Sequence, residues 1–386
     1  MARTFFSGER LRIARNFNGL TAEELASQLD VSKQMISKYE NNRLIPTNEK
    51  IFKIQSILRF PIDFYYPKQN ITYKEETFYR AFKTKSQSDK SISNLSKRFS
   101  AAIRYALEQY IDFPTLDKEL RGNFTDYREA AKTIREKWEL GDKPIENISR
   151  LLEKKGFVIS KLSEGGGKVD ACCGVVEIEK DEYFIIVDSS LNSSYYRQQF
   201  SLAHELGHYL FDSGSYDENE LDSLEVQIME NRANNFASEL LLPEKRIRED
   251  FQTINVEKID SYLQLKQKWN VSIATLVARA HELEVVTSDQ YLKLQKQISY
   301  RRWRKEEPLD TKKALSPQNL RYGIELLINE GVILKKDLKN IISKISDIYI
   351  PEFIIEDLAG LEKGYLREEA EVSEDNKVVF LKNRSQ

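Results

Sequence analysis

The sequence is poor in the residues that most often build metal centres and cross-links. It has three histidines and two cysteines among 386 residues. The two cysteines are adjacent, Cys172 and Cys173, which excludes a disulfide framework and a Cys-x-x-Cys metal site. We expect them to be a pair of small buried residues on a strand.

Long hydrophobic runs are also missing. No stretch of about 18 apolar residues occurs, so no membrane span is predicted. The first residues lack the apolar segment of a secretory signal. Hydrophobic residues make up 40% of the chain and charged residues 31%, with a net charge of −2. This composition is typical of a soluble globular protein with two or three domains, and we expect a cytoplasmic location.

Two of the three histidines fall in one short stretch, His204-Glu205-Leu206-Gly207-His208. Histidines four residues apart on a helix project from the same face, so both imidazoles can bind one metal ion. Glu205 can take a proton from a water held at that metal. The flanking apolar residues predict an amphipathic helix, and an exposed polar helix is the weaker alternative. The third histidine, His281, is expected at the surface.

Catalytic zinc sites usually have three protein ligands and an open position for water, so a third ligand is expected downstream. Asp212, four residues beyond His208, is too close in sequence for this role, although one further helical turn can still place it nearby. A second amphipathic helix, predicted over Gln227–Leu242, offers Glu230 and Glu239 as carboxylates. Glu230 lies near the start of that helix, where it can face the first one.

Three segments rich in β-branched and aromatic residues predict short strands over residues 157–162, 174–178 and 183–187. Zinc peptidases often bind an extended substrate beside an edge strand, and any of these three strands can serve. The residues Tyr195 to Arg197, just before the histidine motif, are candidates for stabilising an oxyanion. A structural role for them is the favoured interpretation.

The first 65 residues predict four short helices. The first covers residues 8–18, and the second begins at Thr21 with Glu24 as its capping box. Ser32 caps the third helix, which reaches Asn41, and a fourth runs from Thr47 to Leu58. Short helices with a tight turn between the second and third are what a helix-turn-helix domain needs.

The third of these helices would present its N-terminal side chains to the major groove of DNA. Residues 1–70 hold 11 Lys and Arg against 7 Asp and Glu, a local positive excess that is typical of a phosphate-binding module. Asn41 and Arg43 are expected to contact backbone phosphates. The residues expected to face base edges are Ser32, Lys33, Gln34, Ser37 and Lys38.

Residues 200–208 and 230–243 together resemble the ImmA/IrrE family of zinc metallopeptidases. The resemblance implies that Glu230 completes the zinc site of His204 and His208, and that the substrate is a repressor or an antitoxin-like protein. Many family members have a second glutamate where this chain has Arg232, which cannot bind the metal. Residues 25–43 are similar to the XRE (Cro/repressor-like) DNA-binding domain, whose members usually act as dimers on two half-sites.

We therefore predict an α+β, mostly helical chain in four parts. An all-α helix-turn-helix domain covers residues 1–67, and a linker with a helical connector covers 68–125. A zincin-like peptidase domain with a small β-sheet and the HExxH helix covers 126–308. A mainly helical C-terminal domain of unknown role covers 309–386. Within the connector, the composition of residues 86–96 favours a flexible segment.

The predicted function is a DNA-binding transcriptional regulator with a Zn2+-dependent endopeptidase domain, acting in a stress or mobile-element response. Its partners would be double-stranded operator DNA and a protein substrate, and a homodimer would suit paired half-sites. The alternative is a non-proteolytic transcription factor or antitoxin that keeps the peptidase fold as a sensor or scaffold. The intact motif argues against this alternative, because zinc binding does not require Glu205.

Overall fold

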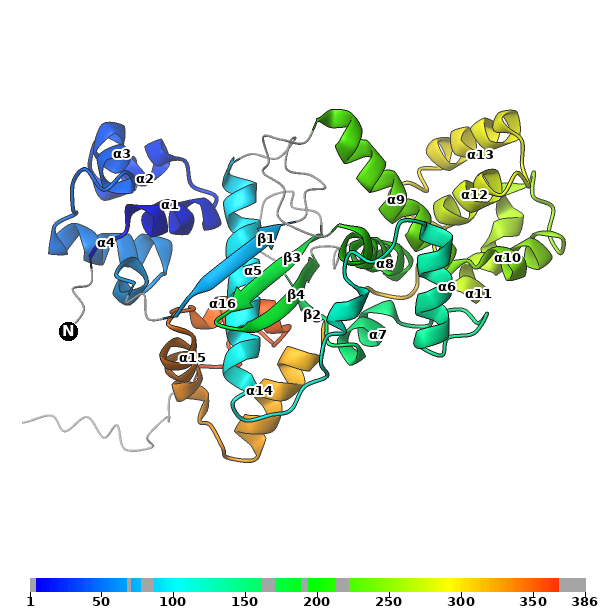
Figure 1. Cartoon of the computed structure of the whole chain (residues 1–386). Coiled ribbons are helices and arrows are strands. Elements are labelled where there is room, and N and C mark those ends of the chain that lie inside the picture. Colours follow the sequence, from blue (N-terminus) through cyan, green and yellow to red (C-terminus); the bar gives the residue numbers. More distant parts are fainter. Residues whose placement is uncertain are drawn as a thin grey trace, which may run out of the picture.

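The structure, a computed structural model, describes residues 5–67, 71–77, 87–161, 171–188, 194–212 and 222–367. For residues 75–77 and 87–91 it describes the backbone alone. The predicted fold class, α+β and mostly helical, is confirmed (Figure 1). Among the described residues, no helix is both long enough and apolar enough to cross a membrane.

The N-terminal helices form a small domain at one end of the molecule (Figure 1). Its predicted caps are present: Thr21 and Glu24 form a capping box, and the Ser32 hydroxyl accepts a hydrogen bond from the Met35 amide at 3.2 Å. The domain consists of α1 (Gly8–Phe17), α2 (Ala22–Leu29), α3 (Lys33–Glu40), α4 (Asn48–Leu58) and the 3-10 helix η1 (Ile62–Tyr65).

A four-stranded sheet lies at the centre of the chain, in the order β1-β3-β4-β2. The three predicted strands are β2 (Val158–Lys161), β3 (Cys172–Ile178) and β4 (Asp181–Asp188). β2 is parallel to β4, and the other pairs are antiparallel. The fourth strand, β1 (Tyr73–Thr77), was not predicted, because its sequence YKEET lacks the apolar alternation of a half-buried strand.

The two faces of the sheet belong to two different cores. Cys172 and Val176 of β3 face a core shared with the N-terminal domain, whereas Cys173 and Val175 face a second core. The first face packs on α5 (Gln87–Leu107), which also contacts α14 (Asn319–Asn329), α15 (Leu338–Ser346) and α16 (Glu352–Ala359). The second core contains α6 (Tyr127–Lys137), α7 (Ile148–Lys154), α8 (Tyr195–Phe211) and α9 (Ser223–Leu241).

The prediction of a flexible segment at residues 86–96 is wrong, because α5 begins at Gln87. Ser93, Ser96 and Ser100 of this helix are buried instead of exposed to solvent. The Ser93 hydroxyl donates to Cys172 Sγ at 2.8 Å, and the hydroxyls of Ser100 and Ser160 lie 2.7 Å apart. Small polar side chains let the helix approach the strands closely, so a serine-rich composition was misleading here. Residues 68–125 thus supply both a strand and a long helix to the sheet.

The remaining helices extend the peptidase region at its far end. A buried cation ties this part together: Lys266 pairs with Glu307 at 2.9 Å and with Asp310. The helices are α10 (Glu244–Phe251), α11 (Tyr262–Trp269), α12 (Ile273–Glu282) and α13 (Ser288–Tyr300), with the 3-10 helix η4 (Ile259–Ser261). The 3-10 helix η2 (Lys118–Leu120) precedes α6, and η5 (Lys335–Asp337) contacts α15.

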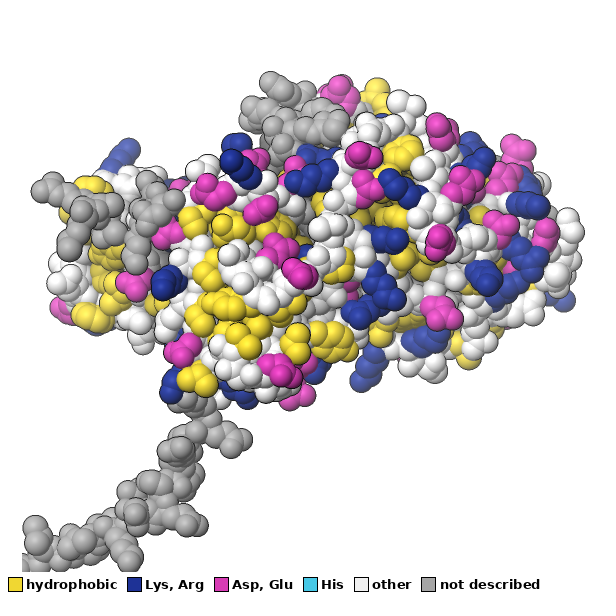
Figure 2. Space-filling view, turned by 60° about the horizontal axis from the view of Figure 1, so that its bottom comes forward, with side chains coloured by type: hydrophobic (Ala, Val, Ile, Leu, Met, Phe, Trp, Pro, Cys, Tyr) yellow, Lys and Arg dark blue, Asp and Glu magenta, His cyan; other side chains and the backbone are white. Residues whose placement is uncertain are grey.

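On the face shown in Figure 2, basic and acidic side chains are intermixed and no field of one sign covers the surface. Hydrophobic side chains gather on the part that lies at the bottom of Figure 1, where α14, α15 and α16 are located. Large exposed apolar residues of this region include Tyr322, Leu326, Val332 and Leu334. The overall charge distribution on this face therefore gives no indication of a nucleic-acid surface.

Candidate metal centre

The centre is built where α8 and α9 approach each other closely. A Cβ on Gly207 would lie 3.0 Å from the Cα of Ala233 and 3.2 Å from a ring carbon of Phe236. The glycine in the middle of the histidine motif therefore lets the second helix come near the first. Glu230 is one turn before Ala233, so this contact brings its carboxylate to the two histidines.

His204, His208 and Glu230 converge on one point. The two Nε2 atoms lie 3.0 Å apart. The Glu230 carboxylate places one oxygen 3.6 Å from His204 Nε2 and the other 3.5 Å from His208 Nε2. Both rings are fully buried, and the Glu230 side chain is 19% exposed. One ligand atom from each residue lies within 4.8 Å of the others, so the three side chains can hold a single metal ion.

Each imidazole is oriented by a hydrogen bond from its other nitrogen. His204 Nδ1 donates to Asn234 Oδ1 at 2.8 Å, and His208 Nδ1 donates to Asp212 Oδ2 at 2.6 Å. With the protons on Nδ1, the Nε2 lone pairs of both rings face each other. Outer carboxylates and amides of this kind fix the tautomer and raise the basicity of ligating histidines.

Arg232 and Asp212 form an ion pair that the sequence did not reveal. The guanidinium Nη2 lies 2.6 Å from Asp212 Oδ1, and the carboxylate is almost completely buried. The guanidinium also lies 4.8 Å from the centre of the Phe211 ring. Arg232 therefore compensates the charge of the buried carboxylate that orients His208. The spacing of four residues between His208 and Asp212 was the one sequence signal for this arrangement.

The electrostatics of the centre favour positive charge. Burial lowers the pKa of His208, but hydrogen bonds to Asp212 and Glu230 and the charge of Glu205 outweigh this effect and raise it to about 10. Glu205 is 1% exposed, and its Oε1 has no hydrogen-bond partner among the described residues. The Cys173 thiol lies against this carboxylate, and burial together with Glu205 raises the pKa of the thiol well above its ordinary value.

The donor set and its spacing fit a small divalent cation. In a tetrahedral zinc site with Zn–N bonds of about 2.0–2.1 Å, two nitrogen ligands are separated by about 3.3 Å. The separations of 3.0, 3.5 and 3.6 Å between the three ligands correspond to one face of such a tetrahedron. Two Nε2 atoms 3.0 Å apart need either a proton or a metal ion between them.

The other candidate residues have partners elsewhere. Glu239 forms an ion pair with Arg279 and accepts a hydrogen bond from the Glu244 amide at 3.0 Å, so it serves the fold. His281 is half-buried, stacks on Tyr291, with ring centres 4.4 Å apart, and is outside the group of metal-binding residues.

Tyr195, Tyr196 and Arg197 also have local partners. The Tyr195 hydroxyl donates to the Glu146 carbonyl, and Lys266 lies 4.4 Å from the centre of the Tyr196 ring. Arg197 donates to the Trp303 carbonyl at 3.1 Å. These contacts favour the structural role over stabilisation of an oxyanion.

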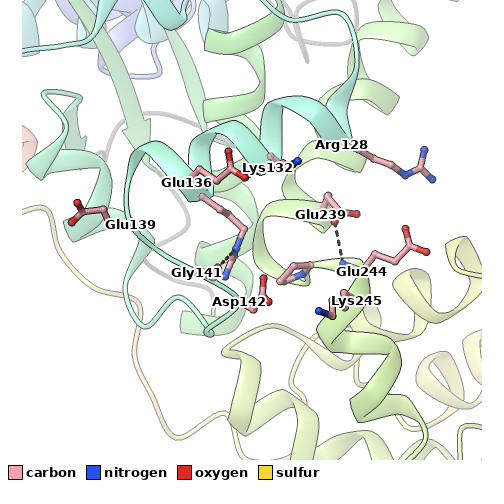
Figure 3. A pocket seen from close by; sticks show the side chains of 12 residues that line it. Arg128, Lys132, Glu136, Glu139, Gly141, Asp142, Glu239, Glu244 and Lys245 are labelled. Carbon is pink, nitrogen blue, oxygen red and sulfur yellow. Dashed lines mark hydrogen bonds and ion pairs between the residues drawn. The ribbon is translucent and has the colours of Figure 1, made fainter.

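A separate cavity of about 680 Å³ lies between α6, α9 and α10 (Figure 3). Two of its charged residues form hydrogen bonds with the backbone. Arg135 donates to the carbonyl of Gly141 at 2.7 Å, and Glu239 accepts from the amide of Glu244. His204, His208 and Glu230 do not line it. The cavity is therefore distinct from the metal-binding group, and its polar groups hold three helices together.

The seven residues predicted to contact DNA are all exposed. Two of them also have a local role. The Ser32 hydroxyl caps α3, and Asn41 donates to the Ser37 carbonyl at 2.8 Å while its Oδ1 accepts from Arg12 at 3.0 Å. The side chain of Gln34 is exposed near the beginning of α3, and Lys33 lies 3.5 Å from Glu23. The predicted base-reading side chains are thus exposed along α3 and at its N-cap.

Comparison with known families agrees with both resemblances. Residues 11–65 match the helix-turn-helix family, and residues 153–281 match the family of the IrrE N-terminal-like domain. No curated protein shows significant similarity to the chain. The second match contains His204, Glu205, His208 and Glu230, and the first contains α2 and α3. The chain therefore joins an XRE-type helix-turn-helix domain to a peptidase-family domain of the ImmA/IrrE type.

Proposed function

We propose that the chain is a DNA-binding regulator whose second domain is a zinc-dependent endopeptidase. The observation that carries this proposal is the convergence of His204 Nε2, His208 Nε2 and the Glu230 carboxylate within 4.8 Å, beside the buried Glu205. Three protein ligands leave a fourth position open, which is the arrangement of catalytic zinc sites.

Zinc bound at this point would lower the pKa of a water toward neutrality and polarise a peptide carbonyl. Glu205 would serve as the general base that accepts a proton from the attacking water and as the acid that returns it to the leaving amine. Its burial, and the lack of a hydrogen-bond partner for Oε1 among the described residues, leave one oxygen available for this task. Asn234 and Asp212 keep the two rings oriented throughout.

We propose that the substrate is a repressor or antitoxin-like protein and that α3 reads an operator in the major groove. Cleavage of such a protein, in a stress or mobile-element response, would change transcription near the site where the chain is bound. Two copies on paired half-sites and a cytoplasmic location follow from this role. Metal analysis of the purified chain tests the proposed zinc peptidase, and sequencing of the promoter DNA that the chain retains tests the proposed operator binding. About one zinc per chain and one enriched operator are expected, and a metal-free chain would contradict the peptidase half.

Asp212→Asn is expected to lower the affinity for zinc about 10- to 100-fold, because the amide leaves His208 with a weaker acceptor and Arg232 without its counter-charge. Competition with a fluorescent zinc chelator measures this effect. Asp222→Asn is the matched control: Asp222 caps α9 away from the metal ligands, and Asn is an equally good cap. Equal zinc affinity in the two variants would contradict the role of Asp212.

Gln34→Ala is expected to weaken operator binding about 10- to 100-fold, since a two-point contact with adenine contributes about 1–3 kcal/mol of discrimination. Fluorescence anisotropy with the retained promoter DNA measures the affinity. Gln55→Ala, on α4, is the control and is expected to bind normally. An unchanged affinity of Gln34→Ala with an intact fold would remove this residue from the reading surface.

A further inference from the structure

Strand β3 begins at the metal centre and has both of its edges paired. The Cys173 thiol, at its N-terminal end, lies against Glu205, and α8 contacts the strand. One edge pairs with β4 over its whole length. The other edge pairs with β1, from Tyr73 opposite Ile178 to Thr77 opposite Gly174. The last described pair of β1 is therefore opposite Gly174, the residue that follows Cys173.

A protein substrate that binds as an extended chain needs a strand edge beside the catalytic group. The β4 side of β3 lies inside the sheet, so the edge that could accept a substrate next to Glu205 is the one that β1 covers. A chain added outside β1 instead would lie two strand spacings, about 9.6 Å, from β3.

We propose that β1 occupies the edge of β3 at which an extended peptide substrate would pair. A substrate then pairs with β3 only after β1 has detached from it. This inference rests on the proposed peptidase function and adds a regulatory element to it. β1 follows the 3-10 helix η1 of the DNA-binding domain in the sequence, with Tyr65 and Tyr73 at the two ends of the connection. β1 therefore connects the DNA-binding domain directly to the edge of β3 at which a substrate would pair.

The start of β1, at the end remote from Glu205, is held by several described contacts. The Thr72 amide donates to Glu179 Oε1 at 2.8 Å, and the Glu179 amide donates to the Thr72 carbonyl at 3.1 Å. The Tyr73 hydroxyl donates to the Ser346 carbonyl, and Arg98 lies 5.8 Å from the centre of the Tyr73 ring. These contacts anchor the start of the strand to the body of the molecule.

The composition of β1 suits a strand that can be displaced. Lys and Glu are depleted in stable strands, and they occupy the three central positions of YKEET. Lys74 pairs with Glu177 at 3.0 Å, but the two side chains are 68% and 32% exposed. An exposed pair of this kind adds little to stability.

A reversible cross-link tests the proposal. Lys74 and Glu177 are directly opposite, at a Cα separation that a disulfide can span, so K74C/E177C can fix β1 on β3. The background is Glu205→Gln, which binds without cleaving, and the probe is fluorescein-labelled casein, an unfolded protein. After oxidation with diamide, we expect casein to bind at least about tenfold more weakly, as measured by fluorescence anisotropy, and the affinity to recover after reduction. The reason is that the cross-link lowers the fraction of molecules in which the edge of β3 is free.

The matched control is E177C/E182C, which joins β3 to β4 through an equally opposed pair and leaves β1 free. Its oxidation is expected to leave casein binding unchanged. A second variant, Lys74→Glu, places like charges opposite each other and should tighten binding about 1.5- to fivefold. The charge-swapped K74E/E177K should return to the affinity of the parent.

Casein binding that is equal in the oxidised and reduced forms of K74C/E177C, or absent from both, overturns the proposal. Such a result would leave the peptidase function standing, since zinc content and cleavage by the Glu205-containing chain are measured separately. A chain without zinc would overturn the peptidase function and would not alter the comparison between the two cross-links.

Discussion

Glu205→Gln is expected to keep its zinc and to lose about 100- to 10,000-fold in the rate of substrate cleavage. Glutamine has nearly the same shape as glutamate but cannot take a proton from water, and this is the size of a general-base contribution. The side chain is buried beside the metal ligands and is not one of them, so metal binding should persist. New protein N-termini in cells that express each form, together with zinc content by mass spectrometry, give the two readouts.

A matched control for this variant is Glu244→Gln, which makes the same change at a partly exposed position at the start of α10, where the carboxylate pairs with Arg248. It is expected to cleave at the normal rate. If Glu205→Gln produces the same new N-termini and the same regulation as the parent chain, the peptidase fold serves as a sensor or scaffold instead.

Glu230→Ala is expected to lower zinc affinity by more than the roughly 10- to 100-fold that loss of an outer hydrogen-bonding partner costs. The change removes one of three direct ligands and leaves two imidazoles with facing lone pairs. Equilibrium dialysis against buffered zinc measures the affinity, and cleavage activity should fall with the bound metal.

Glu239→Gln tests which of the two carboxylates of α9, Glu230 or Glu239, is the third metal ligand, a choice that the sequence alone did not decide. Glu239 pairs with Arg279 and supports the N-terminus of α10, so its loss should lower the melting temperature and leave zinc affinity unchanged. If instead Glu239→Gln loses zinc and Glu230→Ala retains it, the ligand assignment is reversed.

The N-terminal domain was predictable because its signals are local. Thr21, Ser32 and Thr47 each precede a helix and cap it in the structure, as their positions in the sequence indicate. The histidine motif was predictable for the same reason, since a spacing of four residues fixes which side chains share a helix face. In both cases a few neighbouring residues carry the information.

β1 and the ion pair between Asp212 and Arg232 depend on partners far away in the sequence. The register of β1 is set by β3, about 100 residues later, and its polar sequence does not resemble a strand in isolation. Arg232 was recognised as a departure from the ImmA/IrrE pattern, but its role became apparent when the structure placed Asp212 2.6 Å away. Composition was misleading in α5, where buried serines resemble the serines of a linker.

In the proposed regulation, β1 connects the helix-turn-helix domain with the edge of β3. Its start is anchored near Ser346 of α15 and near Glu179, and its other end points toward Glu205. The core that contains the N-terminal domain also contains α5 and the C-terminal helices. A shift of the DNA-binding domain on its operator would therefore act on the same set of contacts that holds β1 on the sheet.

The central claim is that His204, His208 and Glu230 hold a zinc ion. Anomalous diffraction from a crystal of the purified chain, recorded on both sides of the zinc absorption edge, tests it most directly. The account predicts one strong peak about 2.0–2.2 Å from the two Nε2 atoms and a Glu230 oxygen, with a further position open to solvent. A zinc peak elsewhere in the chain, or a Glu230 carboxylate turned away from both rings, would contradict it.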